Sequence, residues 1–117
     1  MSRPGQRARF HIRDTVVLPG RRAQLELPIG RLISSTEIAL PVIVVHGKSD
    51  GPTVGLSAAV HGDELCGVEI IRRVLASVDP RTLSGTIIAT PVVNVHGFNT
   101  GDRYLPDRRD LNRSFPG

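Results

Sequence analysis

The sequence predicts an α/β protein with a mixed β-sheet that contains a βαβ unit. Residues 53–60 and 86–95 are runs of β-branched and small apolar side chains, which is typical of buried strands. Between them the apolar period changes to that of a helix, from about Glu64 to Ser77. A strand, a helix and a second strand in this order predict a parallel pair with a right-handed crossover.

The predicted helix has one apolar face and a clear end. That face carries Leu65, Val68, Ile71, Val74, Leu75 and Val78. Asp79-Pro80 stops the helix, because a residue before proline disfavours helical backbone angles. Arg72 and Arg73 lie late in it, where positive charge suits the helix dipole.

Shorter patterns precede this unit and complete the sheet. Strands are expected at residues 15–18, 24–29 and 38–46, with a turn at 47–52. Pro41 should place the first half of its strand at a sheet edge or a bulge. In the strand at residues 53–60, glycine and alanine should allow close packing in the interior.

Length and composition fit one folded domain. The chain has 117 residues, 39% hydrophobic, with a net charge of only +4, which excludes a disordered chain. No apolar run approaches the roughly 20 residues of a membrane span. The single cysteine excludes a disulfide framework, and the first residues lack the apolar stretch of a secretory signal. A cytoplasmic protein without a membrane partner is therefore expected, with residues 1–13 as a flexible basic leader and 14–117 as the domain.

The excess of basic over acidic residues suggests nucleic-acid binding as one alternative function. Fourteen of the fifteen basic residues are arginine, and the leader holds four of them. Binding of nucleic acid through this leader is not favoured, because single-strand binders combine a positive groove with several aromatic side chains and the leader has only Phe10.

A candidate metal site lies at the start of the predicted helix. His61 follows a strand directly and Glu64 opens the helix, with Gly62 allowing the turn between them. Ligands of open α/β sheets bind at the carboxyl ends of strands. An imidazole nitrogen and a carboxylate oxygen suit zinc. The alternative is an ordinary helix start, in which Asp63 and Glu64 complement the dipole and His61 is a turn residue.

A second polar cluster lies in the last 22 residues, which show little periodicity and are expected to form a long loop. Asn112 and Arg113 offer an amide and a guanidinium fork, a suitable clamp for a carboxylate, and Asp110 could orient the arginine. A solvated, mutually paired charge run is the alternative. Leu111 and Phe115 flank the charges and favour docking of this segment on the domain.

Four motifs together resemble the succinylglutamate desuccinylase/aspartoacylase family. They are His61-Gly62-Asp63-Glu64, Pro91-Val92-Val93-Asn94, Arg103-Tyr104-Leu105-Pro106-Asp107 and the segment DLNRSFPG at residues 110–117. The resemblance runs in order and spacing from about Val42 to Gly117. It implies the N-terminal part of a zinc-carboxypeptidase-like fold, incomplete at its C-terminus.

The resemblance also implies a function and residue roles. The expected activity is a zinc-dependent deacylase that cleaves the amide of an N-acyl amino acid or a similar small molecule with a carboxylate. By position, His61 and Glu64 would be metal ligands and Arg103 would stabilise the oxyanion. Asn112 and Arg113 would bind the substrate carboxylate. Arg108 and Arg109 compete with Arg103 for its role.

The same resemblance predicts an incomplete site in this chain. The family's third zinc ligand, a histidine, and its general base, a glutamate, lie further downstream, so the 117 residues are expected to be an inactive fragment that self-associates through unfinished sheet surface. His96 could replace the third ligand. His46 would lie at the opposite end of the sheet if its strand is antiparallel, and Cys66 is expected to be a small buried residue. A stand-alone anion- or carboxylate-binding module without catalysis and a zinc carboxypeptidase remain the alternatives.

Overall fold

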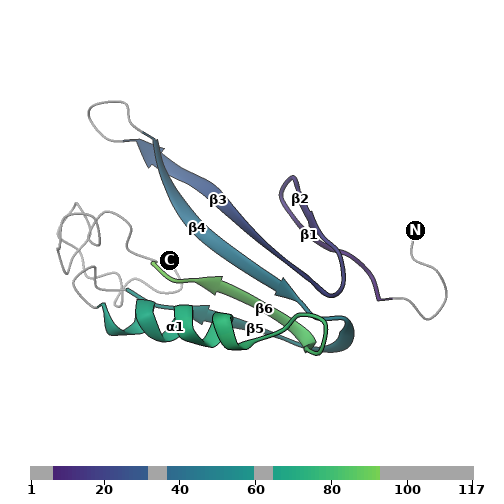
Figure 1. Cartoon of the computed structure of the whole chain (residues 1–117). Helices are drawn as coiled ribbons and strands as arrows, with labels where there is room; N and C mark the ends of the chain where they lie inside the picture. Colours follow the sequence, from purple (N-terminus) through teal and green to yellow (C-terminus); the bar gives the residue numbers. More distant parts are fainter. Residues whose placement is uncertain (1–6, 32–36, 60–64, 93–117) are drawn as a thin grey trace.

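A computed structural model describes residues 7–31, 37–59 and 65–92. A small two-stranded sheet consists of β1 (Phe10–Ile12) and β2 (Thr15–Val17). The larger sheet consists of β3 (Arg21–Arg31), β4 (Glu37–His46), β5 (Ser49–Ser57) and β6 (Ser84–Thr90). One helix, α1 (Cys66–Ser77), connects β5 to β6 in the described part of the chain (Figure 1).

The larger sheet is mixed, with the strand order β3-β4-β6-β5. β3, β4 and β6 are antiparallel neighbours, whereas β5 and β6 are parallel. Since α1 joins the two parallel strands, β5, α1 and β6 form the predicted βαβ unit. The prediction of an α/β fold with a mixed sheet is confirmed.

Alternation along β4 builds a core on each face of this sheet. Val45 points to α1 and packs with Ile71, Leu75 and other apolar residues of the helix face. Val42 and Val44 point to the other face, where they pack with Val17 and the rest of the β1–β2 hairpin. Successive side chains of a strand lie on opposite faces, so one β-branched run serves both cores.

β5 differs from the buried strand that the sequence predicts. It begins at Ser49, inside the predicted turn, and within the described residues it pairs only with β6, which makes it an edge strand. Val54 is therefore 46% exposed. Gly55 has no described heavy atom within 4 Å of the position a Cβ would take, so the expected close packing is wrong there.

Close packing of glycine occurs instead where β5 and β6 begin. A Cβ on Gly47 would collide with the carbonyl oxygens of Leu83 and Gly85. Gly85 has a φ of +102°, and a Cβ there would collide with the carbonyl oxygen of Pro52. Both positions require glycine because the β4–β5 turn and the start of β6 are in backbone contact.

Pro41 lies in β4 opposite Glu26 of β3. In the described residues, β6 pairs with β4 only from Ile43 to His46 and does not reach Pro41. The missing backbone N–H of the proline therefore costs no hydrogen bond to β6. Among the described residues, Pro41 thus lies where this side of β4 has no partner strand, as expected. The register shift of this pair occurs on β3, between Pro28 and Gly30.

The predicted N-terminal strands are present, with one addition. The segments predicted at residues 15–18 and 24–29 correspond to β2 and to the middle of β3. Within the predicted leader, Phe10–Ile12 forms β1, which pairs with β2 across a tight turn at Arg13, whose φ is +49°. A strand of three residues is too short to show a periodicity in the sequence. Phe10 and Ile12 instead stabilise this strand by packing on the larger sheet.

The helix matches its predicted end and begins two residues later than predicted, at Cys66. Ile71 and Leu75 are buried as expected, but Leu65 is 58% exposed. Cys66, the first residue of α1, was expected to be buried and is exposed, since the buried positions of the helix are Ile71 and Leu75. Of the described helices, none is long and apolar enough to span a membrane.

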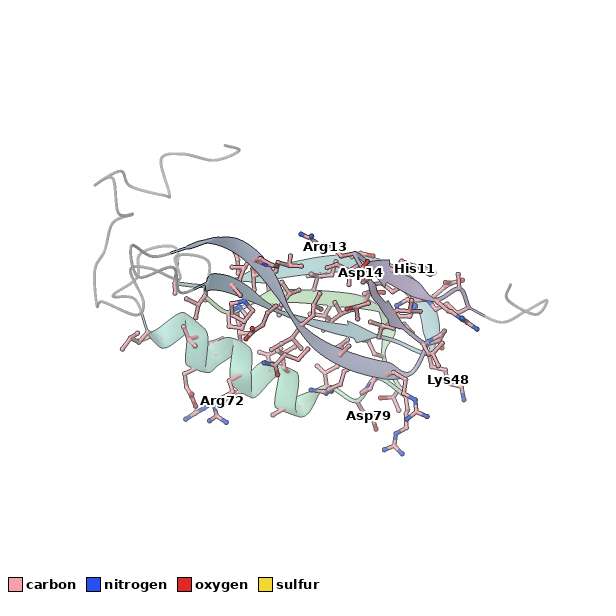
Figure 2. The ribbon with its side chains drawn as sticks, turned by 90° about the horizontal axis from the view of Figure 1, so that it is seen from above. His11, Arg13, Asp14, Lys48, Arg72 and Asp79 are labelled. Carbon is pink, nitrogen blue, oxygen red and sulfur yellow. The ribbon has the colours of Figure 1, made fainter. Side chains whose placement is uncertain are left out.

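The charges of α1 are used differently from the prediction. Arg72 and Arg73 form ion pairs with Glu69, one turn earlier in the helix, and Arg72 points away from the sheet (Figure 2). The carbonyl oxygens of Leu75 and Val78, at the end of the helix, accept hydrogen bonds from Nη2 of Arg22 at 3.0 and 2.6 Å. A cation on β3 therefore complements the negative helix end.

Candidate functional site

The parallel strands β5 and β6 end at the same edge of the sheet. Ser57 pairs with Thr90, and the N–H of Ala58 donates to the carbonyl oxygen of Thr90 at 3.2 Å. The connection from β5 to α1 leaves from this carboxyl end. Its residues 60–64, which include His61 and Glu64, lie outside the described residues.

The backbone turns sharply where this connection begins. Ala59 is buried, at 3% exposure, and has a φ of +51°. Left-handed backbone costs a residue with a Cβ about 1 kcal/mol, and such conformations persist where the surroundings impose them, often beside functional sites. The sequence does not signal a left-handed residue at position 59, since an alanine stands there and the glycine of the connection, Gly62, comes three residues later.

The other end of the connection is held close to the strand. A Cβ added to Gly67, in the first turn of α1, would lie 2.9 Å from the Cβ of Ala58. Any larger side chain at position 67 would push α1 away from β5. Small residues at both positions therefore bring the start of the helix to the carboxyl end of the strand.

Glu69 is the acidic residue in the first turn of α1, but it is already engaged. Its carboxylate accepts hydrogen bonds from Arg72 at 2.6 and 2.9 Å and from Arg73 at 3.0 Å. These bonds, first with Arg72 and then with Arg73, lower its pKa from 4.5 to about 2. Glu69 is thus a surface ion-pair partner and is no substitute for the predicted ligand Glu64.

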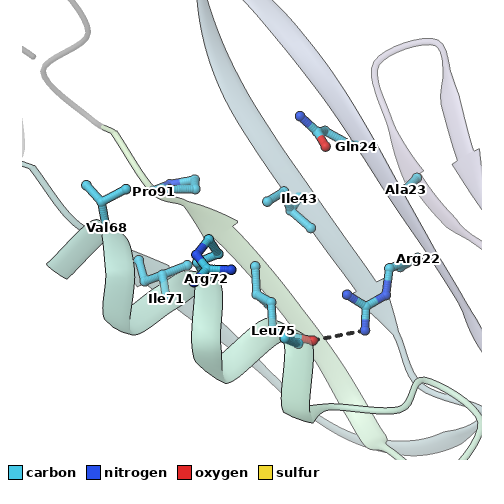
Figure 3. Close-up of a pocket in the computed structure, with 10 residues that line it drawn as sticks. Arg22, Ala23, Gln24, Ile43, Val68, Ile71, Arg72, Leu75 and Pro91 are labelled. Carbon is cyan, nitrogen blue, oxygen red and sulfur yellow. Dashed lines mark hydrogen bonds between the residues drawn. The ribbon is translucent and has the colours of Figure 1, made fainter. Parts of the chain in front are cut away.

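A groove of about 510 Å³ runs between α1 and the β3–β4 part of the sheet (Figure 3). It is lined by Arg22, Ala23, Gln24, Ile43, Val68, Ile71, Arg72, Leu75, Ala76 and Pro91. Two of its polar side chains are committed elsewhere, Arg22 to the end of α1 and Arg72 to Glu69. Among the described residues, the groove therefore offers mainly apolar surface.

The other predicted site residues also lie outside the described part of the chain. These are Arg103, Asn112 and Arg113, together with the alternative ligand His96. Within the ranges that the structure describes, no group of three His, Cys, Asp or Glu side chains is placed to hold a metal.

His46 is described and lies far from the connection. It pairs with Thr86 near the start of β6, while the connection leaves beside Thr90 at the end of β6. Because β4 is antiparallel to β6, His46 is at the opposite end of the sheet, as expected for an antiparallel strand. It cannot complete a site at the carboxyl end of β5.

The fold and this connection define a class, the α/β proteins whose ligand site is expected at the carboxyl ends of parallel strands. The family model for the succinylglutamate desuccinylase/aspartoacylase catalytic domain matches residues 50–117, more than half of the chain. The chain belongs to the succinylglutamate desuccinylase/aspartoacylase family.

Curated relatives and a solved structure agree with this assignment. The chain is 33% identical to the N-alpha-acetyl-L-2,4-diaminobutyric acid deacetylase of Halomonas elongata, over 97% of this chain and 34% of that protein. It is 30% identical to the succinylglutamate desuccinylase of Pseudomonas aeruginosa, over 85% of this chain and 30% of that protein. The crystal structure of an aspartoacylase family protein from Mesorhizobium loti superimposes with a TM-score of 0.72 at 28% identity, covering 94% and 34% of the two chains. The chain thus spans about a third of the length of the curated relatives it matches.

Proposed function

We propose that this chain carries part of the active site of a zinc-dependent hydrolase that cleaves the amide of an N-acyl amino acid or a similar carboxylate-bearing substrate. The parallel β5–α1–β6 unit of a chain in this family carries the proposal, because His61 and Glu64 fall in its strand-to-helix connection. The names of the two curated relatives, a deacetylase and a desuccinylase, support removal of an acyl group.

His61 and Glu64 are the proposed metal ligands, in a segment that the structure does not describe. Their donor atoms, an imidazole nitrogen and a carboxylate oxygen, fit zinc in chemistry. Zinc bound to such ligands lowers the pKa of a coordinated water and polarises a carbonyl. The small residues Ala58 and Gly67 support this assignment, since they bring the two ends of the connection together.

The remaining roles belong to residues further along the chain. Arg103 would place a fixed positive charge beside the oxygen of the attacked carbonyl, where negative charge develops. Asn112 and Arg113 would hold the carboxylate of the substrate through an amide and a bidentate guanidinium. This clamp is the reason for proposing a substrate with a carboxylate.

Residues 14–117 would then form part of the catalytic domain and would contribute two zinc ligands, His61 and Glu64. A catalytic zinc ordinarily takes three protein ligands and a water. We therefore expect the 117 residues by themselves to bind zinc weakly and to hydrolyse N-acyl amino acids at a negligible rate.

The decisive experiment is zinc stoichiometry by elemental analysis of the chain purified without chelator. His61→Ala should reduce whatever zinc is bound, while His11→Ala, a change at an exposed position of β1, should leave it unaltered. About one zinc per chain that depends on His61 would mean that a third ligand is present, with His96 the first candidate. If His61→Ala retains zinc at full occupancy, His61 is not a zinc ligand.

The carboxylate clamp is tested in a form of the protein that hydrolyses N-acyl amino acids. Arg113→Ala should raise the KM for a carboxylate-bearing substrate by about tenfold or more, since a bidentate ion pair is lost. Arg81→Ala is the control, because Arg81 pairs with Asp79 in a turn after α1. Equal kinetics of the two variants would contradict the clamp while leaving the zinc site untouched.

We also infer that two copies of this chain associate through the outer edge of β5. Among the described residues this edge lacks a partner strand, and the apolar side chains of Val54 in β5 and of Ile70 and Val74 in α1 are 46%, 60% and 38% exposed. Val54→Lys should shift the protein toward the monomer in light scattering, because a charged side chain blocks edge pairing. Val16→Lys is the matched control, at 47% exposure on the small hairpin. Equal masses for both variants and the unaltered chain would reject this surface.

A further inference from the structure

The groove between α1 and the β3–β4 part of the sheet begins at the carboxyl end of β6 (Figure 3). Pro91, which lines it, directly follows β6, and Val68 lies in the first turn of α1. The connection from β5 to α1 leaves the sheet at this same edge and ends where α1 begins. One end of the groove therefore lies beside the connection that carries the proposed metal ligands.

The floor of the groove is apolar. Ile71 and Leu75 are buried, at 6% and 4% exposure, and Ile43 and Val68 are half-buried against the same cluster. The polar residues of the lining are exposed and form its rim, namely Arg22, Gln24 and Arg72. An apolar cleft with a few polar groups at its edge is typical of a site for a small molecule.

The opposite end of the groove is bridged by Arg22. Figure 3 shows this side chain at the end away from Val68 and Pro91. Its Nη2 donates to the carbonyl oxygens of Leu75 and Val78 at 3.0 and 2.6 Å, which ties β3 to the end of α1. A molecule that binds at the connection thus meets the groove at the Val68 end.

The length of the groove limits the size of its ligand. From Val68 to Leu75 the helix rises by about 10 Å, at about 1.5 Å per residue. With carbon–carbon bonds of about 1.5 Å, an extended acyl chain of about eight carbons has nearly this length. The volume of about 510 Å³ is also that of a small-molecule site.

We propose that this groove binds the apolar acyl chain of the substrate, with the amide at the Val68 end and the end of the chain at Leu75. The inference rests on the proposed function, because it places the amide beside the proposed metal ligands. An acyl chain needs no hydrogen-bond partner, and each methylene group that leaves water tightens binding by up to about fourfold. The preferred substrates are therefore N-acyl amino acids with acyl chains of medium length.

NMR titration of the 117-residue chain with N-octanoyl-glycine and N-acetylglycine tests the groove. The octanoyl compound should bind at least about tenfold more tightly, since burial of a few of its additional methylene groups is enough. Nuclear Overhauser contacts should place its terminal methyl group near Leu75 and its glycine near Val68.

Ala76→Phe should abolish the preference for the octanoyl compound. Ala76 lines the groove and is exposed, so a ring at this position fills the groove without entering the core. Ile70→Phe is the matched control, because Ile70 is 60% exposed on the same helix and is not a lining residue. Gln24→Phe narrows the groove from β3 and takes the place of Ala76→Phe if that variant does not fold.

Equal affinities for the two compounds would overturn the proposal, and so would an octanoyl preference that survives both groove variants. Contacts in the reverse direction, with the carboxylate at Arg22 and the methyl group at Val68, would also overturn it, because they indicate a fatty-acid site separate from the substrate.

His61→Ala separates this inference from the proposed function. The variant should lose zinc and keep the octanoyl preference, since His61 is not among the lining residues of the groove. Zinc binding that does not depend on His61 would contradict the proposed metal site without changing the preference for the longer chain.

Discussion

The two ends of strand β6 carry a threonine on the same face of the sheet but in opposite surroundings. Thr86, at the start of the strand, is 2% exposed, and its hydroxyl lies in hydrogen bonds with Arg7 and His46. Thr90, at the end, is half-buried, and its hydroxyl donates to the carbonyl oxygen of Leu56 in a long contact of 3.4 Å.

Helix α1 shows the same contrast. Its C-terminal carbonyls are bonded by Arg22 at the end of the sheet where Thr86 lies. That end also holds the Lys48 N–H bond to the carbonyl oxygen of Pro80, with Lys48 and Asp79 close together in Figure 2. At its N-terminus, no described side chain caps the helix, and the strand before it leaves through the left-handed Ala59.

This difference between the two ends of β6 indicates which polar residues stabilise the fold. At the start of β6 the polar groups satisfy one another over long sequence separations, so their removal should cost stability. The carboxyl end lies beside the connection of the proposed site, and hydrogen bonding there is weaker among the described residues. The following substitutions measure this difference in free energy of unfolding.

Gly85→Ala should have the largest effect. A Cβ would collide with Pro52 at a backbone angle that disfavours side chains, so the loss should be about 3 kcal/mol or more. Gly55→Ala, in open space on β5, should change stability by less than about 0.5 kcal/mol. Urea denaturation measures both. Similar losses would show that the start of β6 is not more tightly packed than the outer strand.

The two threonines allow a direct comparison. Thr86→Val leaves His46 Nδ1 and one N–H of Arg7 without their partner and should cost about 1–3 kcal/mol. Thr90→Val removes one long bond from a half-buried hydroxyl and should cost less than about 1 kcal/mol. Chemical denaturation of both variants is the measurement. An equal or larger loss for Thr90→Val would contradict the contrast between the ends.

Arg22→Ala should reduce stability by about 1–2 kcal/mol, because the carbonyls of Leu75 and Val78 lose a charged donor at the helix end. Arg21→Ala, at the neighbouring exposed position of β3, is the control. Thermal unfolding with far-ultraviolet dichroism would follow the helix. Equal melting temperatures for the two variants would show that Arg22 does not stabilise α1.

Glu69→Gln should have the smallest effect, because its ion pairs are on the surface. The pKa of Glu69 is lowered from 4.5 to about 2 by its bonds to Arg72 and Arg73. Its stabilisation is therefore complete above about pH 4.5 and is lost as the pH falls toward 2.

The stability difference between wild type and Glu69→Gln should shrink over that interval and with added salt. Acid and salt titrations of both proteins by fluorescence of an attached dye or by dichroism test this. A difference that grows toward pH 2 would have the wrong sign.

Much of the fold was predictable because its signals are local. The change of apolar period between Val60 and Leu65 marks the step from strand to helix, and Asp79-Pro80 marks the helix end. The candidate ligands His61 and Glu64 were assigned to the strand-to-helix connection for the same reason, and the described β5 and α1 bracket that connection. The side-chain positions of the proposed site stay a prediction.

What local patterns missed depends on partners distant in sequence. Runs of apolar residues look alike in a central and an outer strand, so the exposure of β5 follows from its place at the end of the strand order among the described residues. Cys66 was misjudged because the burial of a helix residue depends on where the sheet lies.

The sequence alone determined the order of the elements after β1, the βαβ unit and the family, since periodicity, turn residues and motif spacing act over a few residues. The hydrogen bonds of Arg7, Arg22 and His46 became apparent only in the three-dimensional structure. Their contacts span 38 to 79 residues of sequence. Such hydrogen bonds form only after strand pairing has brought distant backbone together, and no spacing within the chain announces them.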